Sequence, residues 1–152
     1  MRHVRVEFDR DGTSSDPGGY LERLPSIADA LPVGARAFAT DPEHYNFGGR
    51  RCIKDLKPQH LRSVGDGLEL QLKHNCWKHE EDLTIRYTGV QSVTLNPPGD
   101  VARLRDVMLD EILPIDHGCT HEFTCLSGSI LIACEDLTAT WIDSNCPDLD
   151  RS

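Results

Sequence analysis

The sequence predicts an α+β fold, in which two or three helices pack on one mostly antiparallel β-sheet. Short alternations of apolar and polar residues recur through the second half of the chain, and each is typical of a half-buried strand. Helical spacing of apolar residues occurs only near residues 20–31 and over 101–113. A chain of 152 residues is long enough for one domain with its own core, so a single globular domain is expected over 1–152.

The first 50 residues predict short elements separated by turns. Alternating apolar and charged residues over 4–8 predict an opening strand, and residues 9–19, rich in Asp, Ser and Gly, predict a loop. Two short helical segments are expected at 20–24 and 27–31, because a proline follows each of them. Residues 35–40 are interpreted as another strand.

The middle of the chain predicts three strands and then a helix. Residues 68–72, 83–87 and 93–95 alternate apolar and polar side chains and predict strands. A helix is then expected to start at Asp100, whose carboxylate can cap its first turn, and to end at Pro114. The apolar stripe of this helix consists of Val101, Leu104, Met108 and Ile112.

Residues 120–135 predict an amphipathic β-hairpin with Ser127-Gly128 as its two-residue turn. In this register His121 faces Cys134 across the hairpin. The inward face then carries His121, Phe123, Cys125, Ile130, Ile132 and Cys134. A last strand is expected over 137–141, followed by a frayed tail at 146–152.

Charge and cysteine content restrict the function classes. Sixteen basic and 25 acidic residues give a net charge of −9, which disfavours nucleic acid and suits a basic protein partner. The sequence has no apolar run near the ~20 residues that span a bilayer and no signal-peptide pattern at its N-terminus. We therefore expect a cytoplasmic protein with no membrane partner and with reduced, structural thiols. Whether it is a monomer or a dimer stays open.

A metal site is the sharpest chemical hypothesis that the sequence offers. Alternate residues of a strand point to one side, so His117, Cys119 and His121 could converge, with Cys134 completing a tetrahedral set. His117-Gly118, however, is typical of a turn, and the other three side chains lie among apolar residues of the hairpin. We therefore favour buried thiols and a hydrogen-bonded histidine over the Cys119, His121 and Cys134 metal set, and we expect no cofactor.

The loop between two predicted strands holds a second cluster of reactive side chains, formed by His74, Cys76 and His79. These residues could bind a metal or activate the thiol, but no oxyanion-forming segment or orienting acid accompanies them. Trp77 has another interpretation, because a loop tryptophan followed by three acidic residues is typical of an interface anchor beside a charged rim. The alternative is that Trp77 folds back and caps the sheet edge.

Acidic side chains also recur on the predicted helix. Asp106, Asp110 and Glu111 would lie opposite its apolar stripe, either as an ordinary solvated face or as a surface for a basic partner. A further acid–base pair is conceivable between Asp55 and His60. The sequence lacks the phosphate-loop, dinucleotide, zinc-protease and nucleophile-elbow motifs, so a binding protein is favoured over an enzyme.

In its size, acidity, hairpin and lack of catalytic motifs, the chain resembles the small acidic immunity proteins of bacterial polymorphic toxin systems. That resemblance implies a domain that occludes the active site of a toxin. The predicted partner-binding residues are Trp77, Glu80, Glu81, Asp82, Asp106, Asp110 and Glu111. The rival prediction is a small metal-dependent enzyme or zinc-binding domain that uses the histidine and cysteine clusters.

Overall fold

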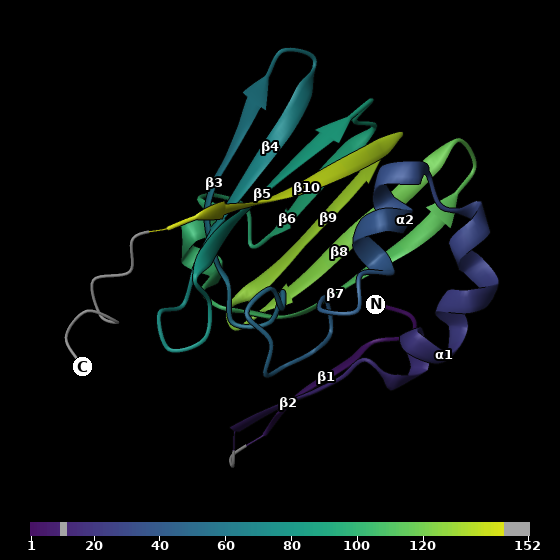
Figure 1. Ribbon diagram of the computed structural model, residues 1–152. Helices are drawn as coiled ribbons and strands as arrows, with labels where there is room; N and C mark the ends of the chain where they lie inside the picture. Colours follow the sequence, from purple (N-terminus) through teal and green to yellow (C-terminus); the bar gives the residue numbers. More distant parts are fainter. Residues whose placement is uncertain (10–11, 145–152) are drawn as a thin grey trace.

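Two four-stranded antiparallel sheets pack face to face and form the body of the protein (Figure 1). The computed structural model describes residues 1–9 and 12–144. The first sheet has the order β10 (Asp136–Asp143), β5 (Glu81–Thr88), β4 (Gly67–Lys73) and β3 (Lys57–Val64). The second sheet has the order β6 (Ser92–Asn96), β9 (Gly128–Cys134), β8 (Gly118–Cys125) and β7 (Val107–Ile115).

The remaining elements surround this sandwich. A small hairpin precedes the helices and consists of β1 (Arg5–Asp9) and β2 (Gly12–Asp16). The helices are α1 (Gly18–Ile27), the 3₁₀ turn η1 (Ala28–Ala30), α2 (Val33–Ala39) and the 3₁₀ turn η2 (Val101–Leu104). In Figure 1, α1 and α2 lie at the side of the sandwich formed by β7 and β10. None of the helices in the described ranges is long and apolar enough to cross a membrane.

The predicted α+β class with antiparallel strands is confirmed, but the single sheet is wrong because the strands divide between two large sheets and a hairpin. The strands expected in the second half at 68–72, 83–87, 93–95 and 137–141 all form. The loop expected at 9–19 is also wrong, since β2 and the start of α1 occupy most of it. The tail expected at 146–152 lies outside the described residues.

The segment expected as a strand at 35–40 is instead helix α2. Three alanines favour the helical backbone. Two backbone N–H groups of its first turn, those of Gly34 and Ala35, donate to the Asp136 carboxylate at 3.0 and 2.9 Å. Gly34 permits this close approach, because a Cβ there would collide with the Leu137 carbonyl oxygen. The helix is therefore fastened along β10.

The helix expected from Asp100 to Pro114 is wrong beyond its first turn. The Asp100 carboxylate does accept the Ala102 N–H at 3.0 Å, but η2 ends at Arg105, which has a φ of 66°. Residues 107–112 are all buried in β7, on both faces of the strand. A strand that is buried on both faces lacks the alternation of apolar and polar residues, so the spacing of its apolar residues imitated a helical stripe.

The hairpin forms, with a register that differs by two residues from the predicted one. The turn is Leu126-Ser127, and His121 pairs with Ile132 while Cys119 pairs with Cys134. A shift of two residues keeps each side chain on its face, so the predicted inward set is buried. Gly128 pairs with Cys125 in the strand rather than forming the turn, and the position requires glycine, because a Cβ there would collide with the Asn96 carbonyl oxygen.

The N-terminal segment is anchored to β7 by one buried carboxylate. Glu111, 2% exposed, accepts the backbone N–H groups of Arg2, His3 and Val4 at 2.9, 2.6 and 2.8 Å. Near it, the N-terminal amine lies 3.3 Å from the half-buried Glu122. These contacts cover the outer face of β7 and explain why this strand is buried on both sides.

We predict that Glu111→Gln lowers the free energy of unfolding by about 2 to 3 kcal/mol, because three donors lose a charged acceptor. Urea denaturation measures the loss. Glu122→Gln is the matched control, and it should cost less than about 1 kcal/mol because its ion pair is partly solvated. Equal losses for the two variants would contradict the anchoring role.

Candidate functional site

A chain of hydrogen bonds crosses the core between the two sheets. The carboxylate of Asp110 on β7 lies between two imidazoles, with Nε2 of His44 at 2.7 Å and Nε2 of His121 at 2.7 Å. His121 Nδ1 lies 2.8 Å from the Tyr87 hydroxyl on β5, in the opposite sheet. His44 Nδ1 lies 2.9 Å from the Phe38 carbonyl at the end of α2. All the side chains of this buried network are at most 1% exposed.

The hydrogen-bond partners assign the protons. Phe38 offers a carbonyl and Asp110 a carboxylate, so both ring nitrogens of His44 donate and the ring is cationic. His121 donates from Nε2 to Asp110 and accepts the Tyr87 O–H at Nδ1, so this ring is neutral. The network therefore holds one positive and one negative charge, and each donor has an acceptor.

The pKa values follow from these contacts. Burial lowers the pKa of His44, but the charge and hydrogen bond of Asp110 outweigh burial and leave that pKa raised. Burial opposes ionisation of Asp110 too, yet the His44 charge and the hydrogen bonds of both imidazoles hold its pKa below the usual range. Burial dominates at His121 and lowers its pKa, so its contact with Asp110 is a hydrogen bond rather than an ion pair.

The residues of the predicted metal set are divided between different partners. Cys119 and Cys134 face each other with their Sγ atoms 3.8 Å apart, while His121 belongs to the buried network. His117 lies in the turn before β8, with a φ of 62°. Within residues 1–9 and 12–144, no group of three His, Cys, Asp or Glu side chains has the geometry to hold a metal ion. The register difference separates His121 from Cys134.

The second reactive cluster is likewise committed to internal contacts. His79 is fully buried, donates from Nε2 to the Cys52 carbonyl at 2.8 Å, and accepts the Asn75 N–H at 3.0 Å. Burial and the nearby Lys78 ammonium lower the pKa of His79. His74 contacts Asp82 at 2.6 Å. Cys76 is disulfide-bonded, which corrects the expectation that every thiol is reduced.

Trp77 remains exposed at the tip of this loop, with 70% of its surface accessible. Its neighbour Lys78 turns inward, where the ammonium donates to the Lys54 carbonyl at 3.1 Å and to Asp55 at 3.2 Å. The Lys78 side chain is 2% exposed. Trp77 is therefore exposed while the adjacent Lys78 side chain is buried. The buried contacts of Lys78 and His79 hold the loop in place beneath the indole. Trp77 does not fold back onto the sheet edge.

Ion pairs fasten the acidic side of the loop. Arg51 forms a bidentate pair with Glu81 at 2.7 and 3.0 Å, and Arg50 lies 3.2 Å from Glu80. Asp82 accepts the backbone N–H of His74 at 2.7 Å as well as its ring nitrogen. The three carboxylates do flank the Trp77 loop, but sequence reasoning missed the two arginines that pair with Glu80 and Glu81. No spacing rule links residues 50 and 51 to residues 80 and 81.

The other predicted partner-binding residues lie elsewhere. Asp110 and Glu111 are 0% and 2% exposed, so neither lies on a surface, because the predicted helix is a strand with both faces covered. Asp106 is partly exposed beside the β8–β9 turn, where its carbonyl accepts the Leu126 N–H at 2.9 Å. The suggested acid–base pair of Asp55 and His60 does not form in these positions, since Asp55 binds lysines and His60 lies on exposed β3.

Comparison with known proteins adds no assignment to this geometry. No family model, curated protein or solved structure matches the chain.

The buried network predicts a specific dependence of stability on pH. The contribution of His44 to the free energy of unfolding is fully present below its unfolded pKa of 6.5. It is lost as the pH rises through the higher pKa of His44 in the folded protein. The contribution of His121 has the opposite sign, because its folded pKa lies below 6.5, so this contribution is lost as the pH falls. Asp110 contributes above its unfolded pKa of 3.8 and loses that contribution on further acidification.

Urea denaturation of the parent, His44→Gln and His121→Gln tests these signs. From about pH 6.5 upward, the stability difference between parent and His44→Gln should shrink, by at most about 1.4 kcal/mol per pH unit for one proton. The difference between parent and His121→Gln should shrink below about pH 6.5. A difference that grows with pH for His44→Gln would contradict the assignment of the cation to His44.

Proposed function

We propose that this protein is a binding module that docks a basic protein partner through Trp77 and the acidic residues that follow it. The observation that carries the proposal is the contrast within the loop. Trp77 is 70% exposed, while the neighbouring Lys78 and His79 side chains are buried and hydrogen-bonded. A large aromatic side chain held on a fixed loop can bury its surface on a partner at a low entropic cost.

Charge around the loop supports a basic partner. The hydrogen bond to Glu81 raises the pKa of Arg51, and the negative charges of Glu81, Glu43 and Asp41 raise it further, so three carboxylates act on this one arginine. The pairs of Arg50 with Glu80 and of Arg51 with Glu81 are exposed, and such pairs contribute only ~0 to 1 kcal/mol. A lysine or arginine of the partner can therefore compete for these carboxylates. The net charge of −9 would speed the encounter.

The specific form of this proposal is an immunity protein that neutralises a toxin by occlusion. An inhibitor of this kind needs a rigid, acidic surface and no reactive group of its own. The side chains most suited to chemistry, namely His44, Asp110, His121 and the facing thiols Cys119 and Cys134, are sealed in the core. Their burial supports binding over catalysis as the role of the exposed surface.

A binding assay with matched variants tests the proposal. The protein, immobilised, is offered purified candidates encoded beside its gene and extracts of its native host. Trp77→Ala combined with charge reversal at Glu80, Glu81 and Asp82 should weaken capture at least ~100-fold, since hot-spot aromatics cost about 2 kcal/mol or more and charge reversal adds repulsion. Phe8→Ala removes an aromatic that is 53% exposed elsewhere, and it should leave capture unchanged.

The toxin form of the proposal has its own readout. Co-expression with the neighbouring gene product should protect cells from growth arrest, and the Trp77 loop variant should lose this protection while Phe8→Ala keeps it. Thermal melting confirms that each variant is folded. Capture that is identical for the parent and the folded loop variant would show that the partner binds another surface.

Elemental analysis tests the rival metal hypothesis. With Cys119 and Cys134 paired and His121 bound to Asp110, we expect less than one zinc per ten chains after purification without chelator. About one zinc per chain, released by Cys119→Ser or Cys134→Ser together with a loss of stability, would favour the metal-dependent alternative.

A further inference from the structure

The sandwich is closed at one side and open at the other. At the closed side, α2 is fastened to β10, and backbone contacts of residues 55 and 56 with Val107 cover the start of β7. At the opposite side, β3 and β6 are the outer strands of their sheets. Within the described ranges, the backbone of β3 forms hydrogen bonds with the backbone of β4 and with no other backbone group. The eight residues of β3 therefore present an unpaired strand edge.

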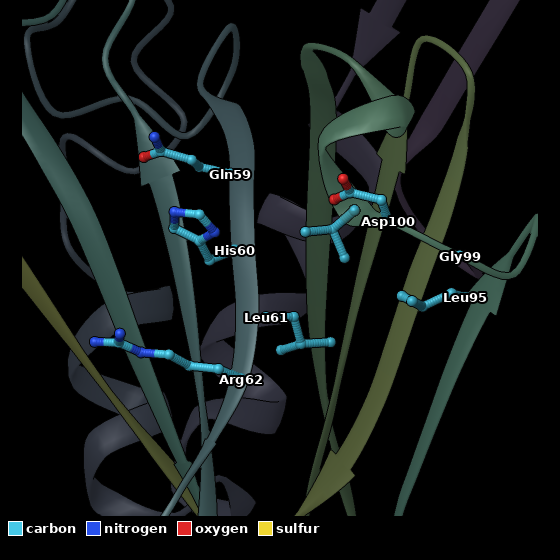
Figure 2. Close-up of a pocket in the computed structure, with 8 residues that line it drawn as sticks. Gln59, His60, Leu61, Arg62, Leu95, Gly99 and Asp100 are labelled. Atoms are coloured by element: carbon cyan, nitrogen blue, oxygen red, sulfur yellow. The ribbon is translucent and has the colours of Figure 1, made fainter.

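A groove of about 290 Å³ runs along this edge, between β3 and the η2 segment. Leu61 of β3 lines it together with Leu95 and Val101 of the second sheet and η2. Figure 2 shows Leu61 pointing toward the side of the groove that carries Leu95 and Asp100, while His60 and Arg62 point away from it. The groove thus combines the apolar side chains of Leu61, Leu95 and Val101 with polar lining residues, including Asp100, beside an open edge.

The outer face of β3 is basic, in contrast to the acidic chain as a whole. Lys57, His60 and Arg62 oppose Lys73, Gln71 and Glu69 of β4, whereas Leu61 opposes the buried Leu70. The Glu69 carboxylate lies between the guanidiniums of Arg62 and Arg86 at 3.0 and 3.1 Å, so these three residues together keep one positive charge. β3 itself contains no acidic residue.

We propose that the free edge of β3 is a docking site for an extended acidic segment of another protein, which would add a fifth strand to the sheet. The side chains of an added strand alternate between the two faces. One set would lie beside Lys57, His60 and Arg62, and the other would enter the groove beside Leu61 and Val101. The geometry therefore selects a segment in which acidic and aliphatic residues alternate.

Charge argues against a second copy of this chain as the occupant. Antiparallel pairing of two β3 edges would place the Lys57 and Arg62 side chains of both copies on one face, where like charges repel. Two features of β3 hinder pairing with another strand, namely Pro58 and a bulge between Pro58 and His60. Both lie in the first part of the edge. From His60 to Val64 the register with β4 is regular, so this stretch can accept a ladder.

The test uses a fluorescein-labelled ten-residue peptide that alternates glutamate and valine, and fluorescence anisotropy measures its binding to the whole protein. We expect saturable binding that Arg62→Glu weakens at least tenfold. The matched control is Arg23→Glu, which reverses an exposed arginine of α1 at the other side of the sandwich and should leave affinity unchanged. Leu61→Asp should also abolish binding, and thermal melting shows that each variant is folded.

Two further peptides separate strand addition from simple charge attraction. A peptide with the same residues, grouped as five glutamates followed by five valines, should bind at least tenfold more weakly. An alternating peptide that is N-methylated at every second residue along the edge facing β3 should lose binding, because it cannot form the ladder. Equal affinity of either peptide, or equal affinity for the Arg62→Glu variant, would overturn the proposal, as would edge-dependent dimerisation of the protein alone. Trp77→Ala should not change this binding, so its outcome is independent of the function proposed above.

Discussion

The carboxylate of Asp110, held between the imidazoles of His44 and His121, is the interaction on which the rest of the structure depends. A lone carboxylate at this depth would be too costly, so its presence requires a cation and a neutral donor at fixed positions. His44 comes from the loop after α2 and His121 from β8, while Tyr87 of the opposite sheet completes the chain. The network therefore determines how the helix, the two sheets and the loop meet.

The side chains of β7 alternate between its two faces, and this alternation links the buried network to the N-terminal segment. Asp110 and Glu111 are consecutive residues of one strand, so their side chains point to opposite faces. Asp110 enters the space between the sheets, and Glu111 points to the outer face, where the backbone of residues 2–4 covers it. Two adjacent carboxylates are thus buried for different reasons, and each one fastens a segment distant in the sequence. The two surfaces proposed above for recognition, the Trp77 loop and the β3 edge, lie at the periphery of this core.

Local patterns were sufficient for the strands with one buried face and insufficient elsewhere. Leu68, Leu70 and Leu72 alternate because only one face of β4 meets the core, so period-two reasoning found this strand and the hairpin of β8 and β9. It failed for β7, where apolar residues on both faces resemble a helical stripe, and for α2, where alanine content outweighed an apparent alternation. Of the site, loop composition indicated a tryptophan beside three acidic residues, but it left open whether the Trp77 indole is exposed or folds back onto the sheet edge. The partnership of His44 with Asp110, 66 residues apart, and the pairing of Arg51 with Glu81 were not predictable, because only the tertiary fold brings these residues together.

The neighbours Trp77 and Lys78 have different roles: Lys78 stabilises the loop, and Trp77 provides its exposed aromatic surface. Lys78 and His79 supply the contacts that the fold needs, whereas the indole of Trp77 stays largely in solvent and adds little to the core. Substitutions at the tip of the loop therefore leave stability nearly untouched. On the function proposed above, substitutions here could change the partner without compensating changes inside, so related proteins could bind different partners on a common scaffold.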